Sequence, residues 1–145
     1  TYDLLIYANQ IQEAIELIKS VEDLPIVLDH IAKPSIKTKS MQDWEKDIRA
    51  LAKYPNLYCK ISGMATEADW TRWKAEDLKP YLDIVVEAFG VDRLLFGSDW
   101  PVCLVASSYE RWLNTIKDYF KEFSSTEQEK IFALNCESFY TLEKA

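Results

Sequence analysis

Two apolar runs in this chain lead into side chains that can do acid–base chemistry. Residues 26–28 run into Asp29 and then His30, the only histidine of the chain, and residues 94–97 are followed two positions later by Asp99. A carboxylate can accept a proton from water, and an imidazole can polarise a carbonyl group. If both runs are parallel strands, their carboxyl ends meet at one edge of a sheet, where catalytic groups gather. The pair of His30 and Asp99 therefore predicts a hydrolytic site.

Three further side chains suit substrate binding, and each has a structural alternative. Lys60 and Lys33 are cations that could meet a substrate carboxylate or a developing oxyanion, and Trp100 could stack on the apolar face of a sugar. Because an unpaired ammonium within an apolar run is costly, Lys60 could equally be an ion-paired residue. Lys33 precedes a proline and suits a solvated loop position. Trp100 could instead be a hydrophobic side chain packed at the mouth of the site.

His30 and Asp99 have structural alternatives as well. A lone histidine at a strand end is often a hydrogen-bonded structural residue, and the Gly-Ser-Asp sequence of residues 97–99 is common in turns and helix caps. Asp29 adjoins His30, but successive side chains of a strand point to opposite sides. We therefore expect Asp29 to be a structural residue or to support the site indirectly.

The elements that must position these residues alternate along the chain. Short apolar runs are followed by segments in which apolar residues recur every three or four positions. The expected strands are residues 4–7, 26–28, 57–61 and 93–97. The expected helices are one that carries Ile11, Ala14, Ile15 and Ile18, then residues 41–53, 79–89 and 108–123, and a final helix from residue 126. This alternation predicts an α/β fold with a parallel sheet and right-handed crossovers.

Two of the helix starts carry the sequence pattern of a capping box, in which a Ser or Thr and a Glu three residues later satisfy backbone N–H groups at the start of a helix. The first pattern joins Ser107 and Glu110, and the second joins Thr126 and Glu129. Both patterns predict the point at which a helix begins.

Composition excludes several classes of protein. A chain of 145 residues with a net charge of -7 and no cluster of Lys and Arg is a poor partner for nucleic acid. No apolar stretch reaches the roughly 18 residues of a membrane span, and the chain does not open with a signal-peptide pattern. Three widely spaced cysteines predict neither a disulfide framework nor a thiolate zinc site. We expect a cytoplasmic protein that acts on a small molecule.

Four strand–helix units suit either an open doubly wound sheet or half of an eight-stranded barrel. A mononucleotide site in the open sheet needs a glycine-rich turn after a strand. The chain has only three glycines, and none belongs to such a motif. A nucleotide-binding sheet is therefore disfavoured.

Three strand ends resemble those of the amidohydrolase-2 family, most closely its sugar-lactonase and dicarboxylate-lactonase branch. The matching segments are residues 27–34 (VLDHIAKP), 58–63 (YCKISG) and 95–101 (LFGSDWP), in that order. The resemblance implies that residues 1–145 form a single partial domain, the C-terminal half of a (β/α)8 TIM barrel with strands five to eight. It also implies a hydrolase that opens a sugar lactone or a carboxylated lactone with activated water, with His30 and Asp99 in the site.

The resemblance implies a divalent metal such as zinc in part of this family, with His30 and Asp99 as candidate ligands. The family's barrel begins with an Asp-x-His-x-His-like strand, which this chain does not contain. A zinc site needs at least three protein ligands, and this chain offers two. Metal dependence varies within the lactonase branch, so a metal-free hydrolase is also compatible with the resemblance.

A half barrel has two unpaired sheet edges. We therefore expect it to be completed by an N-terminal half barrel or by a second copy of the chain. Two other functions stay open: a non-catalytic half-barrel module that binds a small acid or assembles through its open edge, and an aromatic-acid decarboxylase of the wider superfamily.

Overall fold

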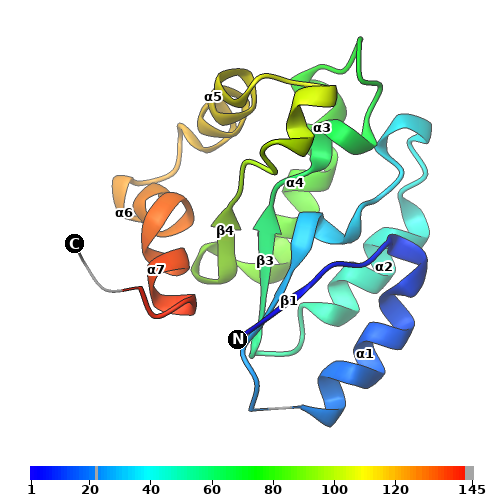
Figure 1. The fold of residues 1–145 in the computed structure, drawn as a ribbon, viewed down its shortest axis with the longest axis vertical. Helices are drawn as coiled ribbons and strands as arrows, with labels where there is room; N and C mark the ends of the chain where they lie inside the picture. The colour runs from blue at the N-terminus through cyan, green and yellow to red at the C-terminus, as the bar shows by residue number, and fades with distance from the viewer. Residues whose placement is uncertain (22, 143–145) are drawn as a thin grey trace.

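The computed structural model describes residues 1–21 and 23–142. A parallel sheet of four strands in sequential order forms its centre (Figure 1). The strands are β1 (Tyr2–Leu4), β2 (Ile26–Leu28), β3 (Leu57–Ile61) and β4 (Leu94–Phe96). A doubly wound sheet reverses its strand order at a switch point, whereas a TIM barrel keeps it sequential. The predicted α/β fold is confirmed, and its strand order is that of half a barrel.

Helices connect the strands and pack mainly against one face of the sheet (Figure 1). They are α1 (Ile11–Ser20), α2 (Gln42–Leu51), α3 (Met64–Glu67), α4 (Ala75–Phe89), α5 (Tyr109–Phe120), α6 (Ser125–Glu129) and α7 (Asn135–Phe139). A π-helical turn over Lys130–Leu134 joins α6 to α7. The predicted apolar stripe of α1 is buried in the main core. In the described part of the chain, no helix combines the length and apolar character that a membrane span needs.

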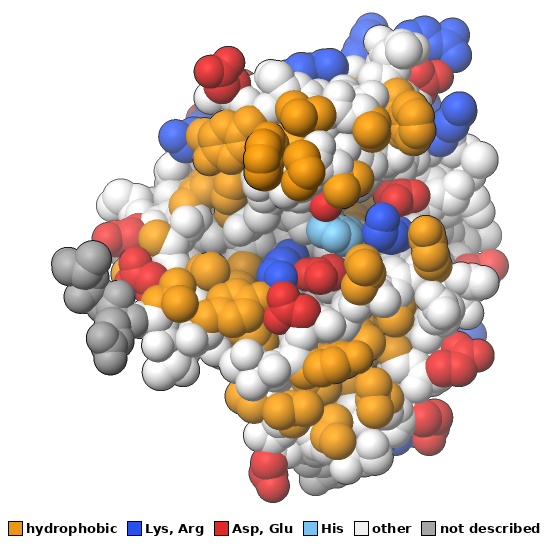
Figure 2. Space-filling view, viewed as in Figure 1, with side chains coloured by type: hydrophobic (Ala, Val, Ile, Leu, Met, Phe, Trp, Pro, Cys, Tyr) orange, Lys and Arg blue, Asp and Glu red, His pale blue; other side chains and the backbone are white. Residues whose placement is uncertain are grey.

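The two faces of the sheet differ in character. In β3, Leu57, Cys59 and Ile61 are fully buried in the main core, whereas Tyr58 and Lys60 point to the other side and are half-buried. We call this other side the open face. Figure 2 shows that it is hollowed, with charged side chains and the histidine gathered at its centre and hydrophobic side chains around them. The open face is therefore the place where a ligand can reach the sheet.

A second, smaller hydrophobic cluster covers part of the open face. Val27 of β2 and Leu95 of β4 pack there against Phe139 of α7. The Phe139 ring also lies 5.0 Å from the ring of Tyr58, measured between centroids. The last helix thus covers the part of the open face near the start of the strands and leaves the carboxyl ends accessible.

Both edges of the sheet are unpaired among the described residues, since β1 pairs only with β2 and β4 only with β3. Next to the first edge, Tyr2, Leu5 and Tyr7 are about half exposed. Unpaired strand edges and exposed hydrophobic side chains together favour association with another sheet.

The first strand differs from its prediction. Residues 4–7 were expected to form it, but β1 is Tyr2–Leu4 and pairs residue by residue with Ile26–Leu28. The chain turns away from the sheet directly after Leu28, so residues 5–7 have no neighbouring strand to pair with. The other three strands lie at the predicted places, within one residue at each end.

The predicted helix starts are wrong in three places. The helix α4 begins at Ala75 and not at residue 79, because the Asp77 carboxylate accepts a 3.0 Å hydrogen bond from the backbone N–H of Lys74. Ser108 rather than Ser107 caps α5, since its hydroxyl accepts from the N–H of Arg111. The last capping box joins Ser124 to Glu127, not Thr126 to Glu129. Ser108 is followed three residues later by Arg111 and so caps α5 without the Glu of a capping box, whereas Ser124, Ser125 and Thr126 all carry the pattern and the sequence alone could not choose among them.

Candidate active site

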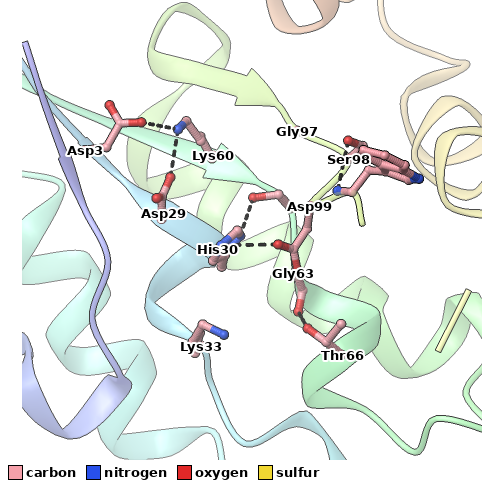
Figure 3. Close-up of polar contacts among 12 residues, drawn as sticks. Asp3, Asp29, His30, Lys33, Lys60, Gly63, Thr66, Gly97, Ser98 and Asp99 are labelled. Atoms are coloured by element: carbon pink, nitrogen blue, oxygen red, sulfur yellow. Dashed lines mark hydrogen bonds and ion pairs between the residues drawn. The ribbon is translucent and has the colours of Figure 1, made fainter. Parts of the chain in front are cut away.

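The structure brings His30 and Asp99 together at the carboxyl ends of β2 and β4. Nε2 of His30 lies 3.6 Å from Oδ1 of Asp99, and the two side chains are only 15% and 10% exposed (Figure 3). This separation is longer than a hydrogen bond, but it is short enough for the carboxylate charge to act on the ring. The two predicted catalytic residues thus share one partly enclosed site.

His30 reaches this position through a left-handed turn. His30, Ile31, Ala32 and Lys33 all have positive φ angles, between 47° and 60°. For residues other than glycine this conformation costs roughly 1–2 kcal/mol each. A 2.8 Å bond from the N–H of Lys33 to the carbonyl of His30 closes the turn, and the buried indole of Trp44 donates to the carbonyl of Ile31 at 2.8 Å. The strained turn is therefore held by one hydrogen bond within it and by one from the buried Trp44 outside it.

Asp99 lies in a second constrained loop. Its φ is 56°, and its carbonyl accepts from the N–H of Cys103 at 2.8 Å. The indole of Trp112, on α5, donates to the carbonyl of Gly97 at 2.8 Å. The hydroxyl of Ser98 accepts from the N–H of Trp100 at 3.2 Å. These bonds fix the backbone on both sides of the carboxylate.

A serine that the sequence analysis did not single out completes the contacts of the imidazole. Oγ of Ser62, just beyond β3, lies 2.7 Å from Nδ1 of His30, and Ser62 is 1% exposed. Ser62 shares the open face with Tyr58 and Lys60 by the two-residue period of a strand, which is the signal that could have identified it. Because it is so deeply buried, Ser62 is not an accessible nucleophile.

Two glycines leave room for the contact between His30 and Ser62: Gly63 lies next to His30, and Gly97 lies next to Ser62. A Cβ atom on Gly63, which has a φ of +63°, would lie 2.7 Å from Cγ of His30. A Cβ atom on Gly97 would lie 3.0 Å from Cβ of Ser62. Only glycine lets the imidazole and the serine pack this closely against the backbone.

The surroundings favour neutral His30 and leave an acceptor on Asp99. Burial lowers the pKa of His30, and attraction by Asp99 and Asp29 offsets only part of that effect. Oδ2 of Asp99 is buried and has no hydrogen-bond partner among the described residues. A neutral imidazole beside a carboxylate with a free oxygen is a suitable arrangement for general base catalysis.

Lys60 is held in an ion cluster on the open face. Its Nζ lies 2.7 Å from Oδ2 of Asp3 and 2.8 Å from Oδ1 of Asp29 (Figure 3). The hydroxyl of Tyr140 donates to both carboxylate oxygens of Asp3 at 2.8 Å. Burial alone would lower the pKa of Lys60, but the hydrogen bonds to Asp29 and Asp3 outweigh it and raise that pKa. Asp29 thus pairs with Lys60 on the open face, and its negative charge also acts on His30.

The other two predicted binding residues lie in different surroundings. Nζ of Lys33 is 3.3 Å from Oε1 of Glu67 and 5.5 Å from the ring centroid of Tyr7. Its side chain is 17% exposed, so Lys33 is not a solvated loop residue. Trp100 is 65% exposed and therefore is not a packed side chain among the described residues. Its indole is available to a ligand or to another part of the protein.

The described residues fit only part of a metal site. Imidazole and carboxylate are suitable ligand types for zinc, and the unpartnered Oδ2 of Asp99 is free to bind a cation. No group of three or more His, Cys, Asp or Glu residues in residues 1–21 and 23–142 is arranged to hold a metal ion. Two ligands are too few for zinc, so the described residues do not by themselves complete a zinc site.

None of the three cysteines is an activated nucleophile. Cys59 and Cys103 are buried and Cys136 is half-buried, and burial raises the pKa of all three thiols. A thiol with a raised pKa carries little thiolate at neutral pH. Among the described residues at this edge of the sheet, His30 and Asp99 are therefore the groups best suited to acid–base chemistry.

Comparison with known proteins identifies the family. The amidohydrolase family model matches residues 3–142. L-fucono-1,5-lactonase of Burkholderia multivorans is 40% identical over 127 residues, which cover 77% of this chain and 43% of that protein. An uncharacterized protein y4mH of Sinorhizobium fredii is 36% identical over 140 residues, which cover 97% of this chain and 46% of that protein. The chain belongs to the amidohydrolase family.

Solved structures agree with this assignment. The crystal structure of an amidohydrolase from Burkholderia multivorans with bound zinc superposes with a TM-score of 0.92 at 33% identity, covering 98% of this chain and 52% of that one. The chain spans about half the length of the curated relatives it matches, between 43% and 50%. It is thus a partial, C-terminal region of the family's barrel.

Proposed function

We propose that this chain supplies strands five to eight of a TIM-barrel hydrolase that opens a lactone with activated water. Asp99 is the general base and His30 polarises the lactone carbonyl. The observation that carries this proposal is the approach of Nε2 of His30 to Oδ1 of Asp99, 3.6 Å, in a site where Oδ2 of Asp99 has no partner among the described residues.

The proposed reaction uses both side chains in the attack of water on the lactone. Asp99 removes a proton from water as the water oxygen attacks the carbonyl carbon, and the C=O electron pair moves to the carbonyl oxygen. The N–H at Nε2 of neutral His30 donates to that developing oxyanion. When the tetrahedral intermediate collapses, the bond to the ring oxygen breaks, and the leaving oxygen takes the proton from Asp99. The product is an open-chain hydroxy acid.

A sugar lactone suits this half of the site better than a carboxylated lactone. The ammonium of Lys60 is paired with Asp3 and Asp29, and that of Lys33 is paired with Glu67. These two predicted binding residues therefore offer a substrate carboxylate no unpaired charge. A neutral lactone with several hydroxyl groups needs no unpaired positive charge for its binding. The exposed indole of Trp100 offers such a lactone an aromatic face. Relatives named L-fucono-1,5-lactonase and L-rhamnono-gamma-lactonase support this substrate class.

The complete site is proposed to need the other half of the barrel. An N-terminal half barrel would pair with the free edges of β1 and β4 and could add substrate contacts, and a second copy of the chain is the alternative. Divalent-metal binding in the complete protein is an alternative to these roles: there His30 and Asp99 would supply two ligands and residues outside this chain the rest. The likeness to dihydroxybenzoate decarboxylases, at 16–18% identity, concerns the fold alone and does not favour that reaction.

The test is hydrolysis of sugar 1,5-lactones and γ-lactones by the full-length protein that carries this chain. We expect Asp99→Asn to lower kcat about 10²–10⁴-fold while binding of the lactone is retained. Asp92→Asn is the matched control, because Asp92 is an exposed carboxylate that pairs with Lys130. Unchanged turnover in Asp99→Asn would show that Asp99 is not the base. Binding without turnover in the unaltered protein would favour the non-catalytic module.

A further inference from the structure

We infer that Ser62 is a positioning residue, which donates its hydroxyl proton to Nδ1 of His30 and so holds the neutral imidazole with its N–H at Nε2, directed toward Asp99. The inference deepens the proposed function and rests on it. Its geometric basis is the 2.7 Å separation between Oγ of Ser62 and Nδ1 of His30.

The group that faces each ring nitrogen of His30 decides whether Ser62 donates or accepts in this hydrogen bond. A neutral imidazole has one N–H and one lone pair. On the Nε2 side stands the carboxylate of Asp99, which accepts but does not donate when ionised. A lone pair at Nε2 would face another acceptor at 3.6 Å, whereas an N–H there points at negative charge. The proton therefore belongs on Nε2, and Nδ1 must accept.

Ser62 is the donor that Nδ1 requires. A serine hydroxyl can donate or accept, and the hydroxyl of Ser62 has no other hydrogen-bond partner among the described residues. With Ser62 1% exposed, water does not compete for this bond. Leaving Nδ1 without a donor would bury an unsatisfied acceptor, which is unfavourable. The hydroxyl thus fixes both the ring orientation and the nitrogen that carries the proton.

Close packing keeps the arrangement in place. Gly63 lies against the imidazole and Gly97 against Ser62, at distances where a Cβ atom on either glycine would collide or press on its neighbour. The ring cannot turn over to exchange its two nitrogens without displacing one of these segments. Ser62 thereby acts on the lactone through His30 and does not itself touch it.

The test is nitrogen NMR of the full-length protein labelled with ¹⁵N-histidine and freed of metal with EDTA. The His30 signals are those that disappear in His30→Gln. We expect an imine-type signal from Nδ1, shifted by an accepted hydrogen bond, and a pyrrole-type signal from Nε2. A pyrrole-type Nδ1 would overturn the inference, because Ser62 would then be the acceptor. This measurement needs no variant of Ser62 and no substrate.

The variant Ser62→Ala provides a second test of the inference. We expect the Nδ1 signal to move to that of an imine nitrogen without a donor, and kcat for lactone hydrolysis to fall about fivefold with KM unchanged, as for one lost hydrogen bond. Ser107→Ala is the matched control, because Ser107 is also buried but donates to the carbonyl of Ser108, away from His30. An Nδ1 signal identical in wild type and Ser62→Ala would overturn the inference. The proposed function would survive that result, since it is tested separately through Asp99.

Discussion

The indole N–H of Trp44, on α2, donates a 2.8 Å hydrogen bond to the carbonyl of Ile31, the residue that directly follows His30 in the left-handed turn. Four successive residues with positive φ are intrinsically unfavourable, so this turn depends on contacts from outside it. The position of the imidazole is therefore coupled to a buried side chain of a helix on the other side of the sheet.

Trp44→Phe is expected to lower both stability and turnover. The substitution keeps an aromatic ring in the core but removes the donor to Ile31, at a cost of about 1–2 kcal/mol. Trp73→Phe is the matched control, because Trp73 is equally buried and donates at 2.8 Å to the carbonyl of Ala106, away from the turn. Urea unfolding should show similar losses for the two variants, while only Trp44→Phe lowers kcat. Equal losses of kcat would contradict a specific role for the turn.

Gly63→Ala is expected to disturb His30 directly. An alanine at this positive φ costs about 1 kcal/mol, and its Cβ would lie 2.7 Å from Cγ of His30. Gly90, with a φ of +69° and a ψ of 162°, lies in a region almost restricted to glycine, so Gly90→Ala has an even larger backbone cost, but its Cβ would have no atom within 4 Å. Steady-state kinetics should therefore show a loss of kcat in Gly63→Ala and not in Gly90→Ala. If Gly63→Ala kept wild-type turnover, the close packing of the imidazole would not matter for the reaction.

Lys60→Met is expected to destabilise the fold without raising KM. Removing the ammonium leaves Asp3 and Asp29 without their shared cation, and for this partly exposed cluster we expect a loss of about 2 kcal/mol. Lys79→Met is the control, because Lys79 pairs with Asp83 on the surface and should cost less than about 1 kcal/mol. A raised KM in Lys60→Met with normal stability would instead support a substrate-binding role for Lys60.

Stability is expected to fall below about pH 6.5 partly because of His30. Burial lowers its pKa from the ordinary value of 6.5, so the unfolded chain binds a proton at a higher pH than the folded chain does. The free energy of unfolding is therefore independent of His30 above pH 6.5 and decreases as pH falls from there to the folded-state pKa. Urea unfolding at about pH 7.5 and about pH 5.5 should show a larger decrease for wild type than for His30→Gln. Equal decreases would mean that the pKa is not lowered by folding.

The strands were predictable where two neighbours fix their ends. The second and third strands lie at the predicted residues, because apolar runs there pair on both sides. The first strand was misplaced because the apolar run of residues 4–7 is longer than its partner strand, and periodicity does not record where the partner ends. Chain-local patterns thus located the sheet but not the limits of its edge strand.

The candidate site was predictable from its strand ends but not from its contacts. His30 and Asp99 stand at positions where residue type and strand order both indicate chemistry. Ser62 was missed because its importance lies in one contact with His30, 32 residues away. The pairing of Lys60 with Asp3 and Asp29 also joins three segments that are far apart in the sequence, and no local pattern encodes which carboxylates share a lysine.

The bond from the hydroxyl of Tyr140 to the carboxylate of Asp3 joins residues separated by 137 positions. During synthesis the first strand and Lys60 emerge long before Tyr140 does. The ion cluster of the open face is therefore completed only when the final helix has been made and has docked across the sheet. Until then the Asp3 carboxylate lacks the hydrogen bond from Tyr140. In the growing chain the ion cluster is therefore incomplete and more hydrated than in the folded protein.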